Sequence, residues 1–589
     1  MFVIGKVISI SNNIVTVGLS IDITNQTNLM NVHVIFQDNN KKIVGEIVGI
    51  SINTATISIL GEIVGNVFVP GLSKKPAFSS SVRIVNMEEL GMILGEQRIV
   101  DNSKIYLGTS TVYSNYKLNL SINDFFSNHF AIIGNSGSGK SSTLARLIQN
   151  IFTSTNYVPV KANIFLFDAY GEYTNAFSRI NDISPMINYK TYTTNINYPD
   201  GDILKIPLWL LGVDDIALLL NASESAQLSI IEKALKLVPI LKGDGEEVLK
   251  YKNDIIARAL MDILRSGKES SKIRDQVIAV LTSFNTENLS LDTIIAQPGY
   301  KRTLKQCLFV DKIGKMQEME LVVDVINKYI TDGLEMPDMH GAVEYNLKDL
   351  SNALDFALIS EGILKSDKVF DYANILSVRL NSLINSECAE YFNYDGMIDR
   401  NGYIARLLST FDGKKAQIVN FNINYVNDRM AKVITKILSK MLFDFATNNV
   451  NRGTIPFHII VEEAHRYVQN DSDVELLGYN IFDRITKEGR KYGVILGLIT
   501  QRPSELSETS VSQCSNFIIL RTLHPKDLKY IEEMVPNISE EIVESLKTLQ
   551  PGNAIAFGNA FKIPINVKID MPNPAPKSSN SDIVKEWYG

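Results

Sequence analysis

The sequence predicts an α/β protein with a small strand-rich domain at its start and a helical insertion in its middle. Short β-branched runs fill residues 1–88, where Asn, Gly and Ser clusters separate them. A buried strand, a glycine-rich turn and a helix start follow one another within residues 130–148. Apolar residues then recur at helical spacing through residues 213–398. At 589 residues the chain is too long for one core, so several domains are expected.

The first 88 residues predict a small barrel, because many short strands at regular spacing are typical of one. Strands are expected at residues 7–10, 14–17, 32–36, 43–48 and 55–59. The full division that we predict is a barrel over 1–88, an α/β core over 89–212, a helical insertion over 213–398, the second part of the core over 399–570 and a flexible arm over 571–589.

The strongest motif lies between the buried strand and the helix. It comprises Gly134, Asn135, Ser136, Gly137, Ser138, Gly139, Lys140, Ser141 and Ser142. Its G-x-x-x-x-G-K-S pattern, in that strand–turn–helix context, predicts a loop that binds the phosphates of ATP. Glycines let backbone N–H groups point at a phosphate chain, and the helix N-terminus adds partial positive charge. We expect Lys140 to reach the β- and γ-phosphates and Ser141 to hold Mg²⁺.

Two further strands end in carboxylates. The strand at 164–167 leads into Asp168, which is expected to face the nucleotide because ligands gather at the carboxyl ends of strands in open α/β sheets. Capping of the next turn is the alternative role of Asp168. The strand at 457–461 leads into Glu462 and Glu463, as in a Walker B strand. We expect Glu462 to help hold Mg²⁺ and Glu463 to be the general base, the alternative being a buried strand with a charged turn.

A third strand, at 494–499, is followed by Thr500 and Gln501. A glutamine at the C-terminal tip of a strand can sense the γ-phosphate or position the attacking water. An ordinary turn hydrogen bond is the alternative role for Gln501.

Composition and charge narrow the class of protein. The net charge is −7, so the chain lacks the basic balance typical of many nucleic-acid-binding domains. The three cysteines are odd in number and far apart, which predicts a reducing, cytoplasmic setting without disulfides or a C-x-x-C zinc site. No stretch approaches the roughly 20 apolar residues of a membrane span. A metabolic kinase is a weak interpretation, because such enzymes are usually small and no second-substrate pocket is indicated.

Five motifs in chain order resemble those of the HerA ATPases of the FtsK–HerA group. They are GNSGSGKS, FLFDAYGEY, HIIVEEAHRY, KEGRKYGVILGLITQRPSEL and SQCSNFIILRT. The strand-rich start looks like the small barrel of that family, and residues 213–398 look like its helical bundle. The resemblance implies a RecA-like core in a homo-hexameric ring that pumps double-stranded DNA with ATP and Mg²⁺.

The resemblance also implies partners and further roles. It makes Gln501 the sensor and Arg490 our candidate for an arginine finger that reaches the neighbouring subunit. Arg406 and Arg521 are rival candidates, and a salt bridge is the alternative for all three. Family members act with a nuclease or a sirtuin-like effector, in DNA processing or defence against phage, and the barrel is the implied docking surface. A ring scaffold that activates an effector without moving DNA is the alternative function.

Overall fold

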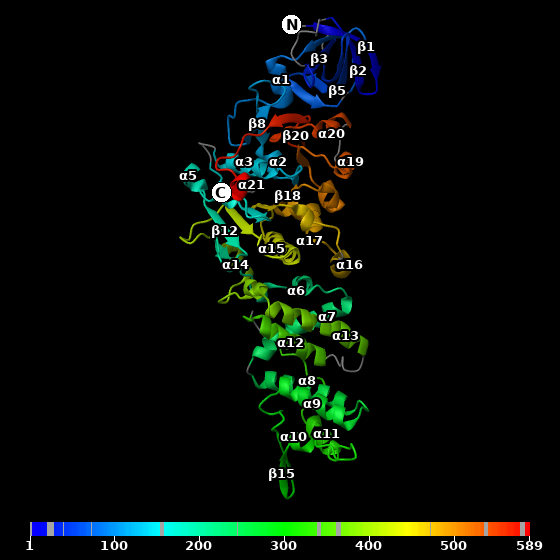
Figure 1. The fold of residues 1–589 in the computed structure, drawn as a ribbon, viewed down its shortest axis with the longest axis vertical. Coiled ribbons are helices and arrows are strands. Elements are labelled where there is room, and N and C mark those ends of the chain that lie inside the picture. Colours follow the sequence, from blue (N-terminus) through cyan, green and yellow to red (C-terminus); the bar gives the residue numbers. More distant parts are fainter. Residues whose placement is uncertain are drawn as a thin grey trace. The chain divides into compact units, whose positions relative to one another are not determined.

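The computed structural model describes residues 3–20, 29–38, 41–71, 73–153, 158–243, 245–337, 343–360, 367–471, 473–534, 540–577 and 583–588 (Figure 1). The chain folds as two compact units. Unit 1 comprises Met1–Asp202, Ile404–Asp471 and Tyr479–Gly589, and unit 2 comprises Ile203–Tyr403 and Ser472–Gly478. The predicted helical insertion therefore falls wholly in unit 2, and the predicted barrel falls in unit 1.

Unit 1 begins with a closed barrel. Its strands are β1 (Val3–Ser11), β2 (Ile14–Leu19), β3 (His33–Asp38), β4 (Lys41–Ser51), β5 (Thr54–Val64), β6 (Val67–Pro70) and β7 (Ser81–Ile84). The order is β2-β1-β7-β3-β4-β5-β6, and β2 also pairs with β5, so the ring closes and β6 extends β5. Buried residues alternate along β5, which gives the barrel an apolar interior. All five predicted strands are confirmed; β6 and β7 were not anticipated.

A buried ion pair joins the barrel to helix α1 (Met87–Leu94). The Arg83 guanidinium on β7 donates two hydrogen bonds to the Glu89 carboxylate, at 2.8 and 2.6 Å, and both side chains are 2% exposed. Glu89 also closes a capping box with Asn86. Burial alone would raise the pKa of Glu89, but hydrogen bonds from Arg83, Lys42 and Asn86 outweigh it and lower the pKa to about 2.

A 12-stranded sheet forms the rest of the unit 1 framework. Its strands are β8 (Lys104–Ser110), β9 (Lys117–Ser121), β10 (Phe130–Ile133), β11 (Ile164–Asp168), β12 (Tyr189–Thr193), β13 (Asp202–Ile203), β16 (Ile418–Asn422), β17 (Phe457–Val461), β18 (Val494–Thr500), β19 (Asn516–Leu520), β20 (Asn553–Gly558) and β21 (Ile565–Lys568). The order is β13-β12-β16-β11-β17-β18-β10-β19-β20-β21-β8-β9.

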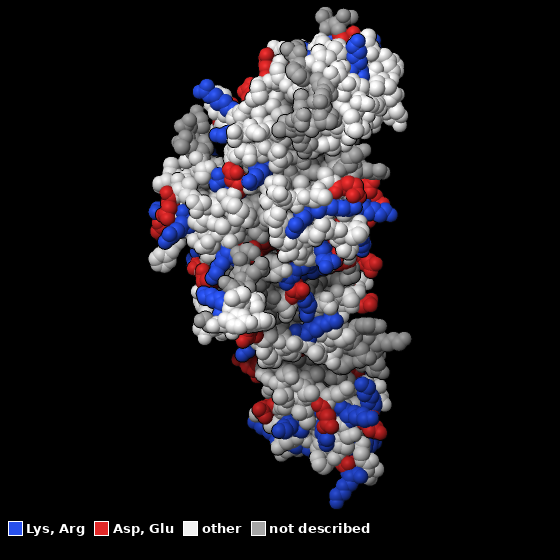
Figure 2. Space-filling model, turned by 45° about the horizontal axis from the view of Figure 1, so that its top comes forward, with Lys and Arg blue, Asp and Glu red and all other residues white. Residues whose placement is uncertain are grey.

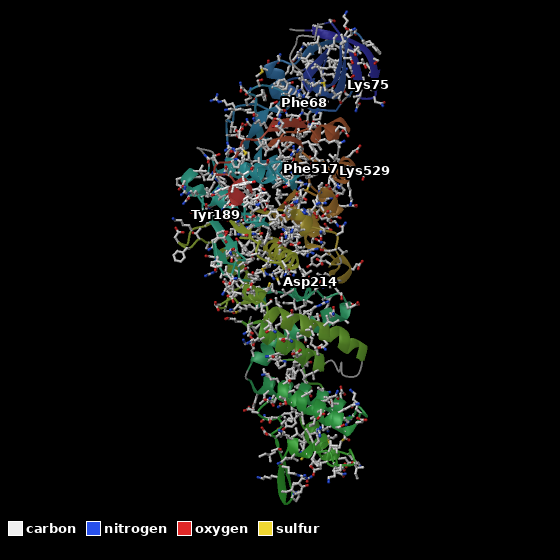
Figure 3. The ribbon with its side chains drawn as sticks, viewed as in Figure 1. Phe68, Lys75, Tyr189, Asp214, Phe517 and Lys529 are labelled. Atoms are coloured by element: carbon white, nitrogen blue, oxygen red, sulfur yellow. The ribbon has the colours of Figure 1, made fainter. Side chains whose placement is uncertain are left out.

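This sheet has a parallel part and an antiparallel part. Strands β12, β16, β11, β17, β18, β10 and β19 run parallel, and β10 and β18 are buried at every residue. Strands β20, β21, β8 and β9 continue it with antiparallel pairs. The Phe517 ring on β19, labelled in Figure 3, stacks on Phe557 of β20, where the strand direction changes. The carboxyl ends of the parallel strands share one edge, where ligands bind in α/β sheets.

Helices connect these strands. In unit 1 they are α1, α2 (Ile122–Phe126), α3 (Lys140–Phe152), α4 (Thr174–Phe177), α5 (Ile180–Ile183), α15 (Asp428–Thr447), α17 (Ile481–Glu488), α18 (Glu508–Ser512), α19 (Pro525–Met534), α20 (Glu540–Leu546) and α21 (Ile583–Tyr588). Helix α14 (Arg400–Leu407) contains the chain boundary between the units. A buried apolar cluster runs from the barrel residues Ile35 and Phe68 through α1 to the sheet (Figure 3).

Unit 2 is mainly helical. It contains α6 (Val213–Leu219), α7 (Ser225–Lys242), α8 (Glu246–Leu264), α9 (Ser270–Ser283), α10 (Leu304–Cys307), α11 (Met319–Asn327), α12 (Leu347–Ser360), α13 (Asp367–Ile384) and α16 (Asp473–Leu477). Strands β14 (Ile294–Gln297) and β15 (Tyr300–Thr303) form a separate hairpin. Within the predicted helical insertion, residues 244, 338–342 and 361–366 lie outside the described residues.

The predicted fold class, an α/β core with an N-terminal barrel and a helical insertion, is confirmed. Part of the predicted arm is bound to the core instead of free: the Gln149 amide donates to the Pro574 carbonyl at 2.8 Å and accepts from the Asn573 N–H at 3.0 Å. Residues 578–582 of the arm lie outside the described residues. None of the described helices is long and apolar enough to cross a membrane.

Candidate nucleotide site

The phosphate-loop motif connects β10 to α3 at the carboxyl edge of the parallel strands. Two of its glycines are required by the geometry. Gly139 has φ +105°, a left-handed conformation that other residues rarely adopt. A Cβ at Gly134 would lie 2.6 Å from the Ser138 hydroxyl oxygen and 2.9 Å from Cβ of Leu520. The loop then enters α3, whose first turn offers backbone N–H groups without intrahelical acceptors.

The loop is fixed by backbone hydrogen bonds to both neighbouring strands and beyond. The Gly134 N–H donates to the Thr500 carbonyl at the end of β18, at 3.2 Å. The Asn135 N–H donates to the Arg521 carbonyl after β19, at 2.9 Å. The Ser138 carbonyl accepts from the Gly552 N–H, just before β20, at 3.0 Å. These bonds hold the loop in place through the sheet.

Lys140 lies inside this loop. Its ammonium donates to the Asn135 carbonyl at 3.3 Å, and the side chain is buried. Burial lowers the pKa of Lys140, while the carboxylates of Glu463, Glu462 and Glu172 act in the opposite direction. The lysine is therefore positioned by the loop and surrounded by negative charge.

Glu462 follows β17, and β18 separates that strand from β10. The Ser141 hydroxyl donates to one carboxylate oxygen of Glu462 at 3.3 Å, and the Ala169 N–H donates to the other at 3.2 Å. Burial, and then the nearby carboxylates of Asp168 and Glu172, raise the pKa of Glu462 well above its usual range. The structure thus brings together the residues at which we predict magnesium binding.

Glu463 has an unusual backbone for a residue with a side chain. Its φ of +47° lies in the left-handed region, and such strain is found mostly at functional sites. One carboxylate oxygen is buried, lies 3.3 Å from Nδ1 of His465 and has no hydrogen-bond partner among the described residues. Burial raises the pKa of Glu463, while Lys140 and Arg466 lower it. The carboxylate is thus free to accept a proton.

Asp168 is completely buried and organises the turn after β11. Its carboxylate accepts from the backbone N–H groups of Tyr170, Glu172 and Tyr173, at 3.3, 3.1 and 3.0 Å. The Asn420 amide donates to it at 3.2 Å. This geometry matches the turn-capping alternative, so Asp168 shapes the site through the turn.

Sequence reasoning missed Glu172, which the Asp168 turn brings to the site. Burial raises the pKa of this half-buried carboxylate, and a hydrogen bond from Ser141 opposes the rise. Glu172 is also close enough to Lys140 for an electrostatic effect. The sequence does hold one sign of this role: Glu172 lies four residues after Asp168, the last residue of β11, so both carboxylates belong to the same turn.

Gln501 follows β18, so it lies at the same sheet edge as the phosphate loop, and its side chain is partly exposed. The preceding residue, Thr500, bonds Gly134 through its carbonyl and lies 3.1 Å from Nδ1 of His465 through its hydroxyl. This position agrees with the predicted sensor but does not assign the role.

The three candidate finger arginines lie in different places. Arg490, in the 3₁₀ turn Gly489–Tyr492, precedes β18 and so lies at the edge opposite the phosphate loop. It is exposed and forms no salt bridge within the described residues. Arg406 is exposed on α14, whereas Arg521 directly follows β19 and bonds the phosphate loop of its own chain. Of the three, Arg490 is separated from its own site and free to act elsewhere.

The residues at the phosphate loop also fit a divalent cation. Glu462, Glu463, Glu172 and Asp168 concentrate negative charge beside the Ser141 hydroxyl. Burial is the main cause of the raised pKa values here, and repulsion between the carboxylates adds to it for Glu462 and Glu172; a hard cation with oxygen ligands would stabilise their charged forms. The orphaned carboxylate oxygen of Glu463 lies in the same cluster.

The chain is similar to several known proteins. A family model described as "Helicase HerA, central domain" matches residues 105–328. The chain is 26% identical over 538 residues to the DNA double-strand break repair helicase HerA of Sulfurisphaera tokodaii, covering 90% of this chain and 81% of that protein. The family model and this relative confirm the predicted resemblance to HerA-type ATPases. The same-named helicase of Pyrococcus furiosus is 25% identical over 524 residues, covering 87% of this chain and 77% of that protein.

The chain is also similar to a solved structure. VirB4 of Thermoanaerobacter pseudethanolicus aligns with a TM-score of 0.45 and 14% identity, over 80% of this chain and 98% of that chain. The comparisons with HerA helicases also confirm the predicted ATPase activity.

Proposed function

We propose that this ATPase forms a hexameric ring and moves double-stranded DNA with the energy of ATP hydrolysis. ATP hydrolysis is supported by one observation above all: Lys140, Ser141 and Glu462 lie together at one edge of the sheet, and Ser141 donates a hydrogen bond to Glu462. The names of the relatives, which are DNA double-strand break repair helicases, support DNA as the substrate.

In the proposed reaction the loop N–H groups and Lys140 hold the β- and γ-phosphates. Ser141 and Glu462 would hold Mg²⁺, which neutralises charge on the phosphates when bound. Glu463 accepts a proton from the attacking water as the water oxygen bonds to the γ-phosphorus and ADP leaves. Gln501 orients that water from the end of β18. Asp168 keeps the adjoining turn, and with it Glu172, in position.

Arg490 is the proposed arginine finger. Its exposed guanidinium at the far sheet edge supports action on the next subunit, because it lies away from the loop of its own chain. A head-to-tail ring joins unlike faces of successive copies, so this edge would meet the site of the neighbour. Stabilising charge on the transferred phosphoryl group in this way is worth about 10³-fold or more in rate.

A separate effector, either a nuclease or a sirtuin-like enzyme, is the proposed partner of the barrel, in DNA processing or defence against phage. Strand β6 extends the closed barrel, and within the described part of the chain no strand pairs with its second edge. The apolar side chains of Val67 and Val69 on β6, and of Val64 at the end of β5, are 59%, 44% and 60% exposed. Such an edge supports docking by strand addition. A cytoplasmic location stays a prediction.

The first experiment measures ATP hydrolysis by the purified chain, with and without duplex DNA, at two salt concentrations. Lys140→Ala provides the blank. We expect stimulation by duplex DNA that falls as salt rises, since phosphate contacts release counterions. A DNA-independent rate would contradict translocation and favour the ring scaffold that activates an effector. In that case Glu463→Gln should still support effector activity.

A further inference from the structure

A small basic lobe in unit 2 has no part in the nucleotide site. We call residues 294–316 the hairpin lobe: it contains the β14–β15 hairpin, α10 and a second turn closed by the bridge between Val310 and Met316. Residues 300–316 include five Lys or Arg and one Asp, although the whole chain has a net charge of −7. Lys and Arg side chains reach the tip that carries β15, at the bottom of Figure 2.

Four of the five cations are exposed and unpaired. Within the part of the chain that the structure describes, no salt bridge involves the ammonium groups of Lys301, Lys305, Lys312 and Lys315. The fifth cation, Arg302, is different: it pairs with Glu318 and lies over the Tyr300 ring, 4.7 Å from its centroid. The ion pair fastens β15 to the chain beyond the second turn. The four lysines therefore have no structural partner to explain them.

The single acidic residue of this segment is occupied by the fold. The Asp311 carboxylate accepts from the N–H groups of Ile313 and Lys315, at 2.8 and 2.9 Å, and from the Gln317 amide. The hydrogen bond from the Lys315 N–H is the largest cause of the lowered pKa of Asp311. Asp311 thus shapes the turn that presents Lys312 and Lys315, and it forms no ion pair with either of them within the described residues.

Large apolar side chains of the same lobe face solvent. Phe309 is 68% exposed, Tyr300 47% and Ile313 92%. They are not needed for the core of the lobe, because Leu304, Cys307 and Leu308 are buried instead. The Arg302 guanidinium lies over one face of Tyr300, and the residue still keeps about half of its surface exposed. Exposed rings among unpaired lysines are the chemistry of surfaces that hold unpaired nucleic-acid strands, on which bases stack and phosphates are neutralised.

We propose that the hairpin lobe binds a single, unpaired DNA strand. The lysines alone would bind duplex DNA as well as single-stranded DNA, because both carry phosphates. The open rings decide between them, since the bases of a duplex are already stacked on one another. An acidic protein segment would use the lysines but would gain little from stacking. The binding needs neither ATP nor translocation, so it stands apart from the proposed motor function.

Fluorescence anisotropy of the full chain without ATP tests the two kinds of contact. With labelled oligo(dT) as the probe at 0.1 M salt, Lys312→Gln/Lys315→Gln should weaken binding about fivefold for each phosphate that the two lysines neutralise, and should reduce the salt slope by about 1.4. The matched control is Lys268→Gln/Lys272→Gln, which removes two exposed lysines elsewhere in unit 2 and should bind normally.

Replacement of the rings separates stacking from charge. Tyr300→Leu/Phe309→Leu should weaken oligo(dT) binding roughly fivefold or more and leave binding of duplex DNA unchanged. Phe411→Leu is the control, because Phe411 is fully exposed in unit 1. Equal losses for single-stranded and duplex probes would overturn the preference for an unpaired strand. Binding of polyglutamate as tight as that of oligo(dT) would instead indicate a surface for acidic proteins.

Cross-linking localises the contact even when other parts of the chain also bind DNA. An oligonucleotide containing bromodeoxyuridine should cross-link to the peptide that carries Tyr300 or Phe309, and the ring variants should lose this product. Cross-links found only in unit 1 would overturn the proposal. Duplex-stimulated ATP hydrolysis, measured on the same variants, tests the motor function separately.

Discussion

The replacement of Glu463 by glutamine tests the proposed general base. Glutamine keeps the shape of the side chain and removes its ability to accept the proton of water. The left-handed backbone at this position, with φ +47°, is strained for either residue, so the stability of the fold should change little. Any loss of rate in Glu463→Gln then reports on chemistry and not on unfolding.

The magnitude follows from the surroundings of the carboxylate. General base catalysis contributes about 10²–10⁴-fold, which is about 3–5 kcal/mol in the activation free energy. Glu463 is buried and one of its oxygens has no hydrogen-bond partner among the described residues, although Nδ1 of His465 lies 3.3 Å away. Burial raises the pKa of Glu463, which makes it a stronger base. We therefore expect kcat to fall by about 10³-fold.

The assay is steady-state ATP hydrolysis with duplex DNA present, combined with the affinity for a fluorescent ATP analogue. Binding should stay within a few-fold of the wild type, because Lys140 and the loop are unchanged. Glu505→Gln is the control: this carboxylate is exposed and forms a surface ion pair with Arg502, at 3.3 Å. If Glu463→Gln keeps more than about a tenth of the wild-type kcat, the base lies elsewhere, and Glu172 is the next residue to test.

Three further predictions concern the barrel and the ring. Glu89→Gln should destabilise the barrel by about 3–5 kcal/mol, because it leaves a buried guanidinium unpaired, whereas the exposed neighbour Glu88→Gln should cost under about 0.5 kcal/mol; hydrogen exchange of barrel amides measures both. In the wild type this contribution of Glu89 should be lost as pH falls from 4.5 toward 2, because its folded pKa is lowered to about 2. Burial raises the pKa of Glu46 to about 7, so barrel stability should fall as pH rises from 4.5 to 7, and Glu46→Gln should stabilise it at pH 8 by up to about 3 kcal/mol but not at pH 4.5 in urea unfolding. Lys140→Ala and Arg490→Ala subunits should each be inactive alone and regain ATP hydrolysis when mixed in one ring; no recovery on mixing would argue against action of Arg490 on the neighbour.

The nucleotide-site motifs were predictable because each depends on local sequence. The phosphate loop needs glycine at fixed positions, and Gly139 and Gly134 are indeed restricted by backbone angle and by space. Glu462 and Glu463 could be found because an apolar strand runs directly into them. The contact between Ser141 and Glu462 follows from those two motifs.

Other features depend on contacts between distant segments, which a single sequence does not display. Glu172 reaches the site only because Asp168 folds the intervening turn by accepting three backbone N–H groups. The pairing of Arg83 with Glu89 needs the barrel to place β7 beside α1. Strands β14 and β15 have four residues each and lie among helices. Alternation of apolar and polar residues over so few positions does not distinguish a strand from the surrounding helical pattern.

The bond from Gly552 to Ser138 makes the phosphate loop part of a mechanical linkage. Gly552 also accepts from the Ile569 N–H at 2.9 Å, just after β21, so the loop is tethered to the antiparallel part of the sheet. That part continues through β21 and β8 to β9, and β8 and β9 contribute to the apolar cluster that includes barrel residues. A displacement of the loop on ATP binding would thus be transmitted through these hydrogen-bonded strands to residues that pack against the barrel. Slower hydrogen exchange at Gly552 and Ile569 in the ATP-bound state would reveal this tension, and the barrel would then sense whether the motor is loaded.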